Sequence, residues 1–152
     1  MILLTCSAGG HLTEMRQLES FYGKQPHSFV TFERPDTISL AEKETVYFIP
    51  RPARNPITTI RAFFRALSIV DEVKPRMVVS TGADVTVPVC LAAKLRGVPV
   101  VFIESYCRPY TASWSGNIIS LFADRVFYQW PELKKYYPSG IHTGSIFAGK
   151  QP

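Results

Sequence analysis

The first eleven residues, Met1-Ile-Leu-Leu-Thr-Cys-Ser7-Ala-Gly-Gly10-His11, join an apolar run to a pair of glycines and a polar residue. A short apolar run that ends in glycines is typical of a buried strand that turns tightly into a helix. Adjacent glycines let the backbone bring amide N–H groups close to a ligand, and a helix N-terminus adds further donors. The stretch predicts a strand–loop–helix unit, whose loop either binds phosphate or serves only as a tight turn.

The same alternation of strand and helix continues along the chain. The predicted strands are apolar runs without a polar–apolar alternation, which indicates strands that are covered on both faces. They lie at 1–6, 27–32, 45–49, 76–81, 98–103 and 125–129. The predicted helices lie at 11–22, 56–73, 84–96 and 113–122, with short helical turns at 36–43 and 131–137. Such βαβ units predict a Rossmann-like, mostly parallel sheet with helices on both faces, and the absence of a linker or repeat predicts a single α/β domain over 1–152.

Composition and charge narrow the class of protein. The chain has 152 residues, of which 46% are hydrophobic and 19% charged, and this excludes a disordered protein. Its 17 Lys and Arg residues outnumber its 12 Asp and Glu residues, which gives a net charge of +5. A basic balance favours a phosphate-bearing ligand or an anionic membrane surface. We expect no nucleic-acid partner, because the basic residues are spread along the chain and no binding motif is present.

Three cysteines without a C-x-x-C pair indicate reduced thiols, and they predict neither a disulfide framework nor a metal site. No apolar run reaches the roughly 18 to 20 residues that span a bilayer. Residues 1–6 already read as a strand, so we expect no signal peptide and no transmembrane segment. These features predict a cytosolic protein and leave open whether it attaches peripherally to the cytoplasmic face of the membrane.

Polar residues follow four of the predicted strands, where ligands bind in parallel sheets. These loops are Ser7–His11, Thr81–Asp84, Glu104-Ser105 and Gln129-Trp130. His11 is either a general base or a capping histidine. Glu14 is interpreted first as a cap of the first helix and only second as a functional residue. Asp84 and Trp130 each also have a purely structural interpretation, as a helix cap and as packing.

A second basic stretch runs from Arg51 to Arg65. Its apolar residues have helical spacing, which most often means that the helix packs on the sheet. In the alternative interpretation, basic and aromatic side chains face anionic lipid. The residues of this candidate membrane surface are Arg54, Arg61, Phe64 and Arg65.

Together these stretches resemble a known family. The matching residues are Ser7-Ala-Gly-Gly-His-Leu-Thr-Glu-Met15, Ser80-Thr-Gly-Ala83, Phe102-Ile-Glu-Ser-Tyr-Cys-Arg108, Ser113-Trp-Ser-Gly116, Ala123-Asp-Arg-Val-Phe-Tyr-Gln-Trp-Pro-Glu-Leu133 and Gly144. The chain resembles the asparagine-linked-glycosylation protein fourteen family, and most of all its bacterial exopolysaccharide and capsule members of the PssD type. The resemblance extends over essentially the whole chain, with its motifs in the same order.

The resemblance implies the N-terminal half of a GT-B glycosyltransferase, which holds a lipid-linked acceptor and touches the membrane. It implies a two-chain hexosyltransferase that moves a sugar from a nucleotide-sugar to a polyprenyl-pyrophosphate-linked sugar in polysaccharide biosynthesis. The sugar nucleotide would be held by a catalytic partner chain similar to the C-terminal half, without which this subunit is inactive. No Asp-x-Asp is present, in agreement with a scheme that needs no metal or cofactor. Eukaryotic members carry an N-terminal membrane anchor, whereas this chain starts at the first predicted strand.

The resemblance also assigns roles. Ser7, Ala8, Gly9 and Gly10 would cradle the pyrophosphate, and either His11 or Glu104 would be the catalytic base. The acceptor would be held by Thr81, Gly82, Ser105 and Arg108, and the partner chain would face Gln129 and Trp130. An alternative is a non-catalytic adaptor that only recruits and stabilises the catalytic subunit, in which changes at His11 and Glu104 leave activity intact. A third is an independent nucleotide-binding enzyme, for which Glu33 and Asp36 are weak ribose ligands.

Overall fold

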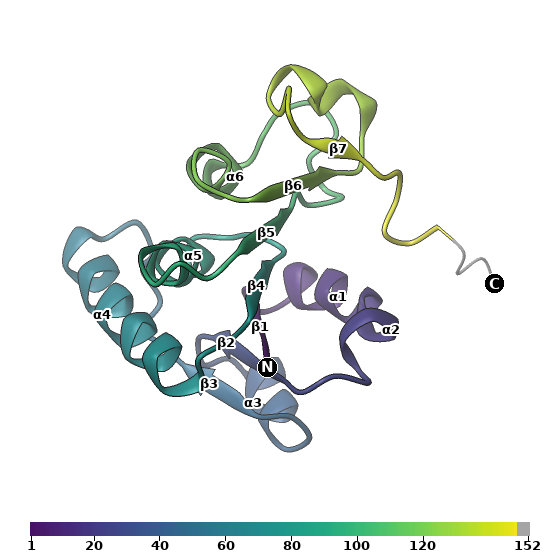
Figure 1. The fold of residues 1–152 in the computed structure, drawn as a ribbon. Helices are drawn as coiled ribbons and strands as arrows, with labels where there is room; N and C mark the ends of the chain where they lie inside the picture. The colour runs from purple at the N-terminus through teal and green to yellow at the C-terminus, as the bar shows by residue number, and fades with distance from the viewer. Residues whose placement is uncertain (149–152) are drawn as a thin grey trace.

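The computed structural model describes residues 1–148, and their strands join in one parallel sheet (Figure 1). The strands are β1 (Ile2–Thr5), β2 (His27–Thr31), β3 (Val46–Phe48), β4 (Met77–Ser80), β5 (Val100–Ile103), β6 (Arg125–Tyr128) and β7 (Ile141–His142). The helices are α1 (Gly10–Gln17), α2 (Glu19–Tyr22), α3 (Pro35–Ala41), α4 (Pro56–Val73), α5 (Thr86–Leu95), α6 (Trp114–Ile119) and the 3₁₀ helix η1 (Pro131–Lys135).

The strand order is β3-β2-β1-β4-β5-β6-β7, and each neighbouring pair is parallel. The predicted α/β sheet is thus confirmed, and all of its described pairs are parallel. The order reverses between β1 and β4, so the loops after these two strands open away from each other. Ligands of open α/β sheets bind at such a point, outside the carboxyl ends of the strands.

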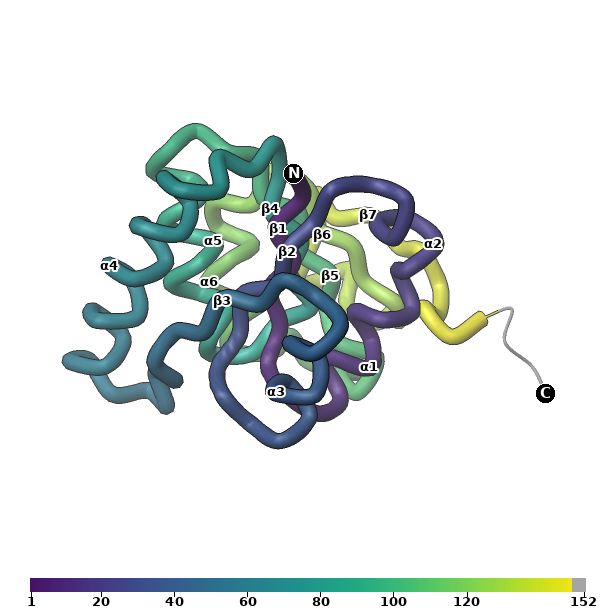
Figure 2. Tube along the Cα trace, turned by 90° about the horizontal axis from the view of Figure 1, so that it is seen from below, coloured from purple at the N-terminus to yellow at the C-terminus, as the bar shows by residue number. Residues whose placement is uncertain are grey.

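Helices cover the two faces of the sheet unequally. Figure 1 shows α4, α5 and α6 on one face and α1 with α2 on the other, and Figure 2 confirms that α4 and α2 lie on opposite sides. On the second face, the outer strands β5 and β6 contribute half-buried side chains such as Val101 and Phe127 to a cavity of about 550 Å³. Among the described helices, none is both long and apolar enough to cross a membrane.

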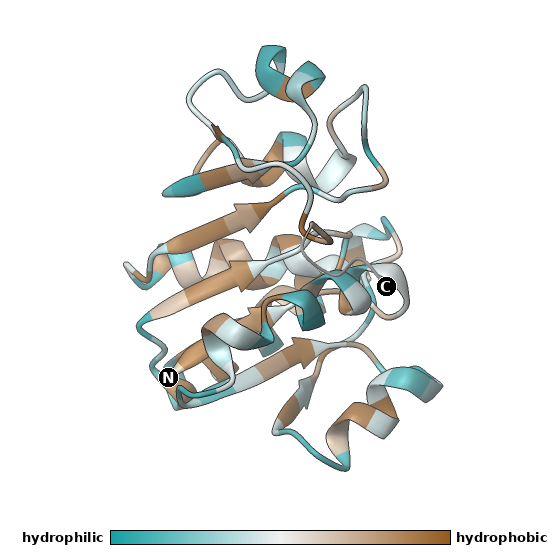
Figure 3. Cartoon of the chain, turned by 90° about the vertical axis from the view of Figure 1, so that its right-hand side faces the viewer, coloured by the Kyte–Doolittle hydropathy of each residue, from teal (hydrophilic) through white to brown (hydrophobic). Residues whose placement is uncertain are grey.

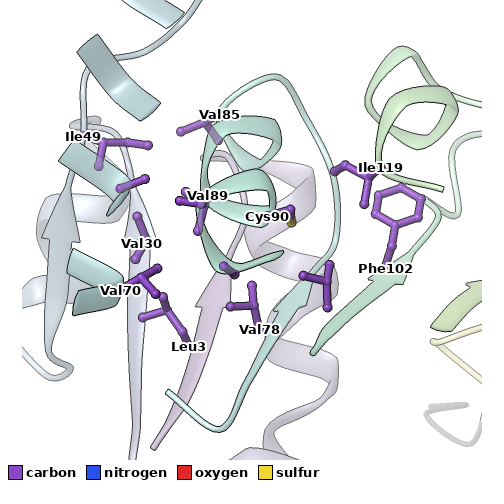
Figure 4. Close-up of a cluster of buried hydrophobic side chains, with 14 of the residues drawn as sticks. Leu3, Val30, Ile49, Val70, Val78, Val85, Val89, Cys90, Phe102 and Ile119 are labelled. Carbon is purple, nitrogen blue, oxygen red and sulfur yellow. The ribbon is translucent and has the colours of Figure 1, made fainter. Parts of the chain in front are cut away.

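The core follows from strands that are apolar on both sides. Along β1, Leu3 packs toward α4 and α5, whereas Ile2 and Leu4 pack toward α1. Figure 4 shows the first of these clusters, in which Val78 of the sheet lies toward Val89 and Cys90 of α5 and Phe102 lies beside Ile119 of α6, and Figure 3 shows the strands as mostly hydrophobic. Burial raises the pKa of the Cys6 and Cys90 thiols to about 12, so both stay protonated.

Helix α4 has the bounds that the sequence predicts, because its end signals are local. Pro56 is its first residue, and the side chain of Asn55 accepts hydrogen bonds from the N–H groups of Ile57 and Thr58. It ends at Val73, and the next residue, Lys74, has a left-handed backbone conformation (φ +47°) directly before a proline.

Elsewhere the structure departs from the predicted elements. The predicted helix at 11–22 is two helices, α1 and α2, because the chain tightens at Leu18, whose N–H bonds to the carbonyl of Met15 three residues earlier. The two-residue strand β7 was not predicted, since both of its residues are exposed and carry no apolar run. The turns predicted at 36–43 and 131–137 are α3 and η1.

Candidate functional site

Two cavities lie at the carboxyl edge of the sheet, beside the point where the strand order reverses. The first, of about 520 Å³, is lined by the loop after β1 together with residues of the β2–α3 segment. The second, of about 380 Å³, is lined by the loops after β3, β4 and β5. They share His11, Arg51, Ala83 and Asp84, so they form one depression with two lobes. Three of the four predicted loops therefore meet there, and the Gln129-Trp130 loop lines neither lobe.

His11 stands in the first turn of α1, between the two cavities, with its side chain 29% exposed. Its Nδ1 lies 2.8 Å from the carbonyl oxygen of Thr81. Because a carbonyl only accepts, this contact requires a proton on Nδ1 and leaves Nε2 as the unprotonated nitrogen of the neutral ring. The ring is thus set up to take a proton on Nε2.

Thr81 and Gly82, predicted as substrate ligands, hold the histidine in place. The Thr81 hydroxyl donates to the carbonyl of His11 at 2.9 Å, so the two residues are joined by a pair of bonds. Gly82 has a φ of +100°, and a Cβ there would lie 3.4 Å from Cε1 of His11. The β4 loop therefore supports the imidazole ring, and glycine is needed both for the backbone and for the close approach.

Glu14 is not a helix cap, which corrects the sequence interpretation. The residue before α1 is Gly9, and Glu14 lies beyond the first turn with 4% of its surface exposed. Its Oε1 accepts hydrogen bonds from the Tyr106 N–H (2.6 Å) and the Ser105 hydroxyl (3.2 Å), and its Oε2 lies 3.8 Å from Nδ1 of His11. The carboxyl group thus connects the histidine with the loop after β5.

We expect Glu14→Gln to be more stable than the wild type at neutral pH. Burial raises the pKa of the Glu14 carboxyl, while the Tyr106 N–H, His11 and Ser105 act in the opposite direction. The folded chain then holds this proton more tightly than the unfolded chain, so the free energy of unfolding falls as pH rises from the ordinary carboxyl value to the raised one. Glutamine keeps an acceptor oxygen and does not titrate, so the gain should grow through this window and stay constant above it.

Urea unfolding of both proteins between pH 4 and pH 8 measures this difference. Glu14→Ala is the contrasting variant, because it leaves the Tyr106 N–H and the Ser105 hydroxyl without their acceptor. It should be less stable than Glu14→Gln by about 1–3 kcal/mol at every pH, because neither variant titrates at this position. A Glu14→Gln protein that is less stable than the wild type throughout the range would contradict the prediction.

Ser105 and Arg108, the other predicted acceptor ligands, line the second cavity, but most of their polar groups form hydrogen bonds within the chain. The Ser105 hydroxyl donates to Glu14 and accepts from the Cys107 N–H. The Arg108 guanidinium donates to Thr111 and to the carbonyl of Ala112 through Nε and Nη2. The Nη1 group has no such bond among the described residues, and it remains for a ligand.

Glu104, the alternative base, is 1% exposed and lines neither cavity. Its Oε1 accepts from the Ser105 N–H at 2.9 Å. Its Oε2 accepts from the N–H and the hydroxyl of Ser113, each at 2.9 Å, and from the hydroxyl of Tyr137. Burial and this carboxylate together raise the pKa of Tyr137. A Cβ on Gly116 would collide with the Tyr137 hydroxyl oxygen and with Oε2 of Glu104, so glycine makes room for this buried network.

Gln129 and Trp130, predicted to face a partner chain, make internal hydrogen bonds. Gln129 is 4% exposed, and its amide donates to the carbonyl of Glu104 and accepts from the Ile146 N–H. The indole N–H of Trp130 donates to the carbonyl of Tyr106 at 2.7 Å, and the two rings pack with their centroids 5.0 Å apart. The two residues therefore fasten the loop after β5 and the segment after β7.

The glycine loop lines the first cavity through Ser7, Ala8 and Gly9. The Ser7 hydroxyl donates to the carbonyl of Ala8. Gly9 has a φ of +75°, and its N–H donates to the Asp36 carboxylate at 2.7 Å. The Gly9 N–H, one donor of the predicted phosphate cradle, is therefore already bonded to an acidic side chain. The sequence had suggested Asp36 only as a weak ribose ligand.

Sequence reasoning missed the role of the loop between β3 and α4. Arg51 lines both cavities and Arg54 lines the second. Asp84, which is not the residue that precedes α5, accepts a hydrogen bond from the Ala53 N–H at 2.9 Å. The signal was visible as the basic run from Arg51 onward, but the sequence assigned Arg54 to a membrane surface instead of the site.

Comparisons with known proteins agree with this architecture. The UDP-N-acetylglucosamine transferase subunit ALG14 of Mus musculus is 29% identical over 95% of this chain and 82% of its own length, and the Homo sapiens subunit is 28% identical over the same shares. The UDP-N-acetylglucosamine--N-acetylmuramyl-(pentapeptide) pyrophosphoryl-undecaprenol N-acetylglucosamine transferase of Oceanobacillus iheyensis is 36% identical over 69% of this chain, which corresponds to 30% of that enzyme.

Solved structures share the fold. The crystal structure of Acinetobacter baumannii MurG superposes with a TM-score of 0.77 at 21% identity, covering 98% of this chain and 46% of MurG. UDP-N-acetylglucosamine 2-epimerase from Rickettsia bellii also gives 0.77, at 15% identity and 45% of its length. The chain thus spans less than half of these structures. The family model described as "Oligosaccharide biosynthesis protein Alg14 like" matches residues 51–146, and the chain belongs to this family.

Proposed function

We propose that the chain is the acceptor-binding and membrane-recruiting subunit of a two-chain glycosyltransferase. The enzyme moves a sugar from a nucleotide-sugar to a polyprenyl-pyrophosphate-linked sugar in polysaccharide or oligosaccharide biosynthesis. Relatives named as a UDP-N-acetylglucosamine transferase subunit and as a pyrophosphoryl-undecaprenol N-acetylglucosamine transferase support this class of reaction. The observation that carries it is His11, which stands between two cavities with Nδ1 2.8 Å from the carbonyl oxygen of Thr81 and so leaves Nε2 for a substrate.

In this reaction, Nε2 of His11 takes the proton of the acceptor hydroxyl as its oxygen attacks the anomeric carbon of the donor sugar. The new C–O bond forms while the bond to the nucleoside diphosphate breaks, and in-line attack inverts the anomeric centre. The nearby Glu14 carboxylate stabilises the imidazolium that results, since its Oε2 is 3.8 Å from Nδ1. Thr81 keeps the ring in the reactive tautomer.

A partner chain supplies the sugar-nucleotide site in this proposal. The chain covers 30% of the Oceanobacillus iheyensis enzyme and 46% of MurG, so each of these proteins is more than twice as long as the part that it shares with the chain. The nucleoside diphosphate is the leaving group, and its charge is met mainly by the partner. His11 has no donor sugar to act on without the partner chain, so the isolated subunit transfers no sugar.

The membrane surface in this proposal is the exposed face of α4. Ile57, Ile60 and Phe64 are 72%, 56% and 62% exposed, and they lie on one side of the helix because their spacing is three and four residues. Arg61 and Arg65 are exposed on the same face. An apolar stripe flanked by arginines suits the interface of an anionic bilayer. Arg54, in contrast, packs on the Trp114 ring at 5.2 Å and belongs to the site.

Phe64→Ser should weaken binding to anionic vesicles about tenfold, because a half-exposed Phe that enters the interface contributes roughly 1.5 kcal/mol or more. Arg61→Gln should weaken it about fivefold, and that loss should shrink at high salt. Sedimentation with vesicles of phosphatidylcholine and 30% phosphatidylglycerol measures both. Phe21→Ser is the matched control, since Phe21 is 45% exposed on α2 across the sheet. Equal losses for Phe21→Ser and Phe64→Ser would exclude α4 as the membrane surface.

Co-expression with the neighbouring glycosyltransferase reading frame tests the proposed function. A tagged chain should retain that partner, and the pair should transfer sugar from a nucleotide-sugar to a polyprenyl-pyrophosphate-linked sugar, whereas neither chain should do so alone. A complex whose activity survives the loss of His11 would instead indicate an adaptor. The absence of both a complex and a gain in activity would refute the proposal.

A further inference from the structure

The loop between β3 and α4 carries Arg51 and Arg54 and has a strained backbone at its centre. Ala53 and Arg54 have φ values of +48° and +56°, in the left-handed region that side chains with a Cβ seldom adopt. Such residues cost of order 1–3 kcal/mol each and persist where their surroundings hold them. Here the Asp84 carboxylate accepts from the Ala53 N–H at 2.9 Å and thereby ties this loop to the one after β4.

Each of the two guanidinium groups rests on an aromatic ring. The Arg51 Cζ lies 5.0 Å from the centroid of Phe32, and the Arg54 Cζ lies 5.2 Å from that of Trp114. A guanidinium held over a ring is attracted to the ring face through its charge and keeps N–H groups for other partners. The two guanidinium groups are therefore held in place before a ligand binds, which reduces the side-chain entropy that binding would cost.

The second cavity is the more electropositive of the two lobes. Its lining contains three arginines, Arg51, Arg54 and Arg108, against the single carboxylate of Asp84. Arg51 approaches that carboxylate only to 4.0 Å. Two parallel N–H donors match the oxygens of a phosphate group, and arginine therefore recognises phosphates better than lysine does.

The first cavity is less suited to an anion. Its lining balances Arg34 and Arg51 against Asp36 and Asp84. The Gly9 N–H that would hold a phosphate oxygen already donates to Asp36 at 2.7 Å. A phosphate group on the glycine loop would have to displace this carboxylate or lie beside it.

We infer that the second cavity is a diphosphate site in which Arg51 and Arg54 form a clamp. The inference rests on the proposed function for the source of the ligand, the diphosphate of the lipid-linked acceptor. It revises the part that the glycine loop plays, because the phosphate groups bind to the β3–α4 loop. The clamp immediately precedes α4, so a polyprenyl chain leaves it toward the exposed Ile57 and Phe64, while the sugar extends toward His11.

Isothermal titration of the full chain with farnesyl diphosphate tests the clamp, with farnesyl monophosphate and UDP as the comparison ligands. Arg51→Gln and Arg54→Gln should each weaken the affinity for farnesyl diphosphate about tenfold, and the double variant about a hundredfold. Arg125→Gln, the same change at the opposite edge of the sheet, should bind within twofold of the wild type. Asp36→Asn should do so as well, because the diphosphate lies in the other lobe.

The outcomes separate this inference from the proposed function. Wild-type affinity in the Arg51→Gln and Arg54→Gln variants would overturn the clamp, as would an affinity more than tenfold higher in Asp36→Asn. Binding of UDP that is as tight and as dependent on both arginines would keep the diphosphate site but assign it to a nucleotide, against the proposed acceptor role. Weaker binding of farnesyl diphosphate by both variants would uphold the clamp. If the wild-type pair then transfers no sugar, the proposed reaction is refuted while the clamp stands.

Discussion

Replacing His11 by alanine is expected to slow sugar transfer by the assembled pair by about 10²–10⁴-fold, the contribution of a general base. The expectation follows from the bond between Nδ1 and the Thr81 carbonyl, which leaves Nε2 to accept the proton of the attacking hydroxyl. The binding of farnesyl diphosphate should change little, because the inferred clamp lies on a different loop. The loss should therefore appear in kcat and much less in KM.

Three measurements make the result specific to the base. Added imidazole should restore part of the lost turnover in His11→Ala, since the small base can enter the space that the ring leaves. His142→Ala, an exposed histidine on β7, should transfer sugar at the wild-type rate. Circular dichroism and gel filtration of the pair should be unchanged. Near-normal turnover of a correctly folded His11→Ala pair would remove the histidine from the chemistry and favour the adaptor.

Local sequence signals were enough for most of the fold. Helix α4 has the predicted bounds because proline, a side-chain cap and a Lys-Pro end are all neighbours in sequence. The described strands other than β7 were visible because a sheet covered on both faces needs continuous apolar runs. Leu18 shows the limit of such signals, since it continues the helical pattern while its backbone bonds three residues back.

The candidate site was predictable in its location but not in its contacts. The rule that ligands bind at the carboxyl ends of parallel strands correctly brought the loops after β1, β4 and β5 together. The pairing of Glu14 with the Tyr106 N–H spans 92 residues, and that of Asp84 with the Ala53 N–H spans 31. No periodicity or spacing carries such information, so Glu14 was taken for a cap and Arg54 for part of a membrane surface.

The contacts of Glu104 could not be predicted from the sequence either. Its position after β5 suggests a catalytic base, whereas its hydrogen bonds indicate a structural role. We expect Glu104→Ala to lower the free energy of unfolding by about 3 kcal/mol or more. The change leaves the Ser105 N–H, the two Ser113 donors and the Tyr137 hydroxyl without an acceptor in a buried place. Each such group costs roughly 1–3 kcal/mol, and water entering the vacated space offsets part of the sum.

Thermal unfolding of the full chain measures this loss, which corresponds to a melting temperature lower by roughly 6–12 °C for a chain of this length. Glu132→Ala, an exposed glutamate on η1, should leave the melting temperature unchanged. Tyr137→Phe removes one donor and keeps the carboxylate, so it should cost only about 1 kcal/mol. This graded series is the signature of a carboxylate that holds three segments of the chain together.

Turnover at low temperature, where Glu104→Gln remains folded, then separates the two candidate bases. If Glu104 only positions the loop after β5, turnover per folded pair should stay within a few-fold of the wild type, because His11 and its bond to Thr81 are untouched. A catalytic Glu104 would instead lose about 10²–10⁴-fold in kcat with little change in melting temperature. That pattern, together with normal turnover in His11→Ala, would transfer the role of base from the exposed histidine to the buried carboxylate. The exposure of the two groups argues against it, since a base must reach the hydroxyl that it deprotonates and Glu104 lines neither cavity.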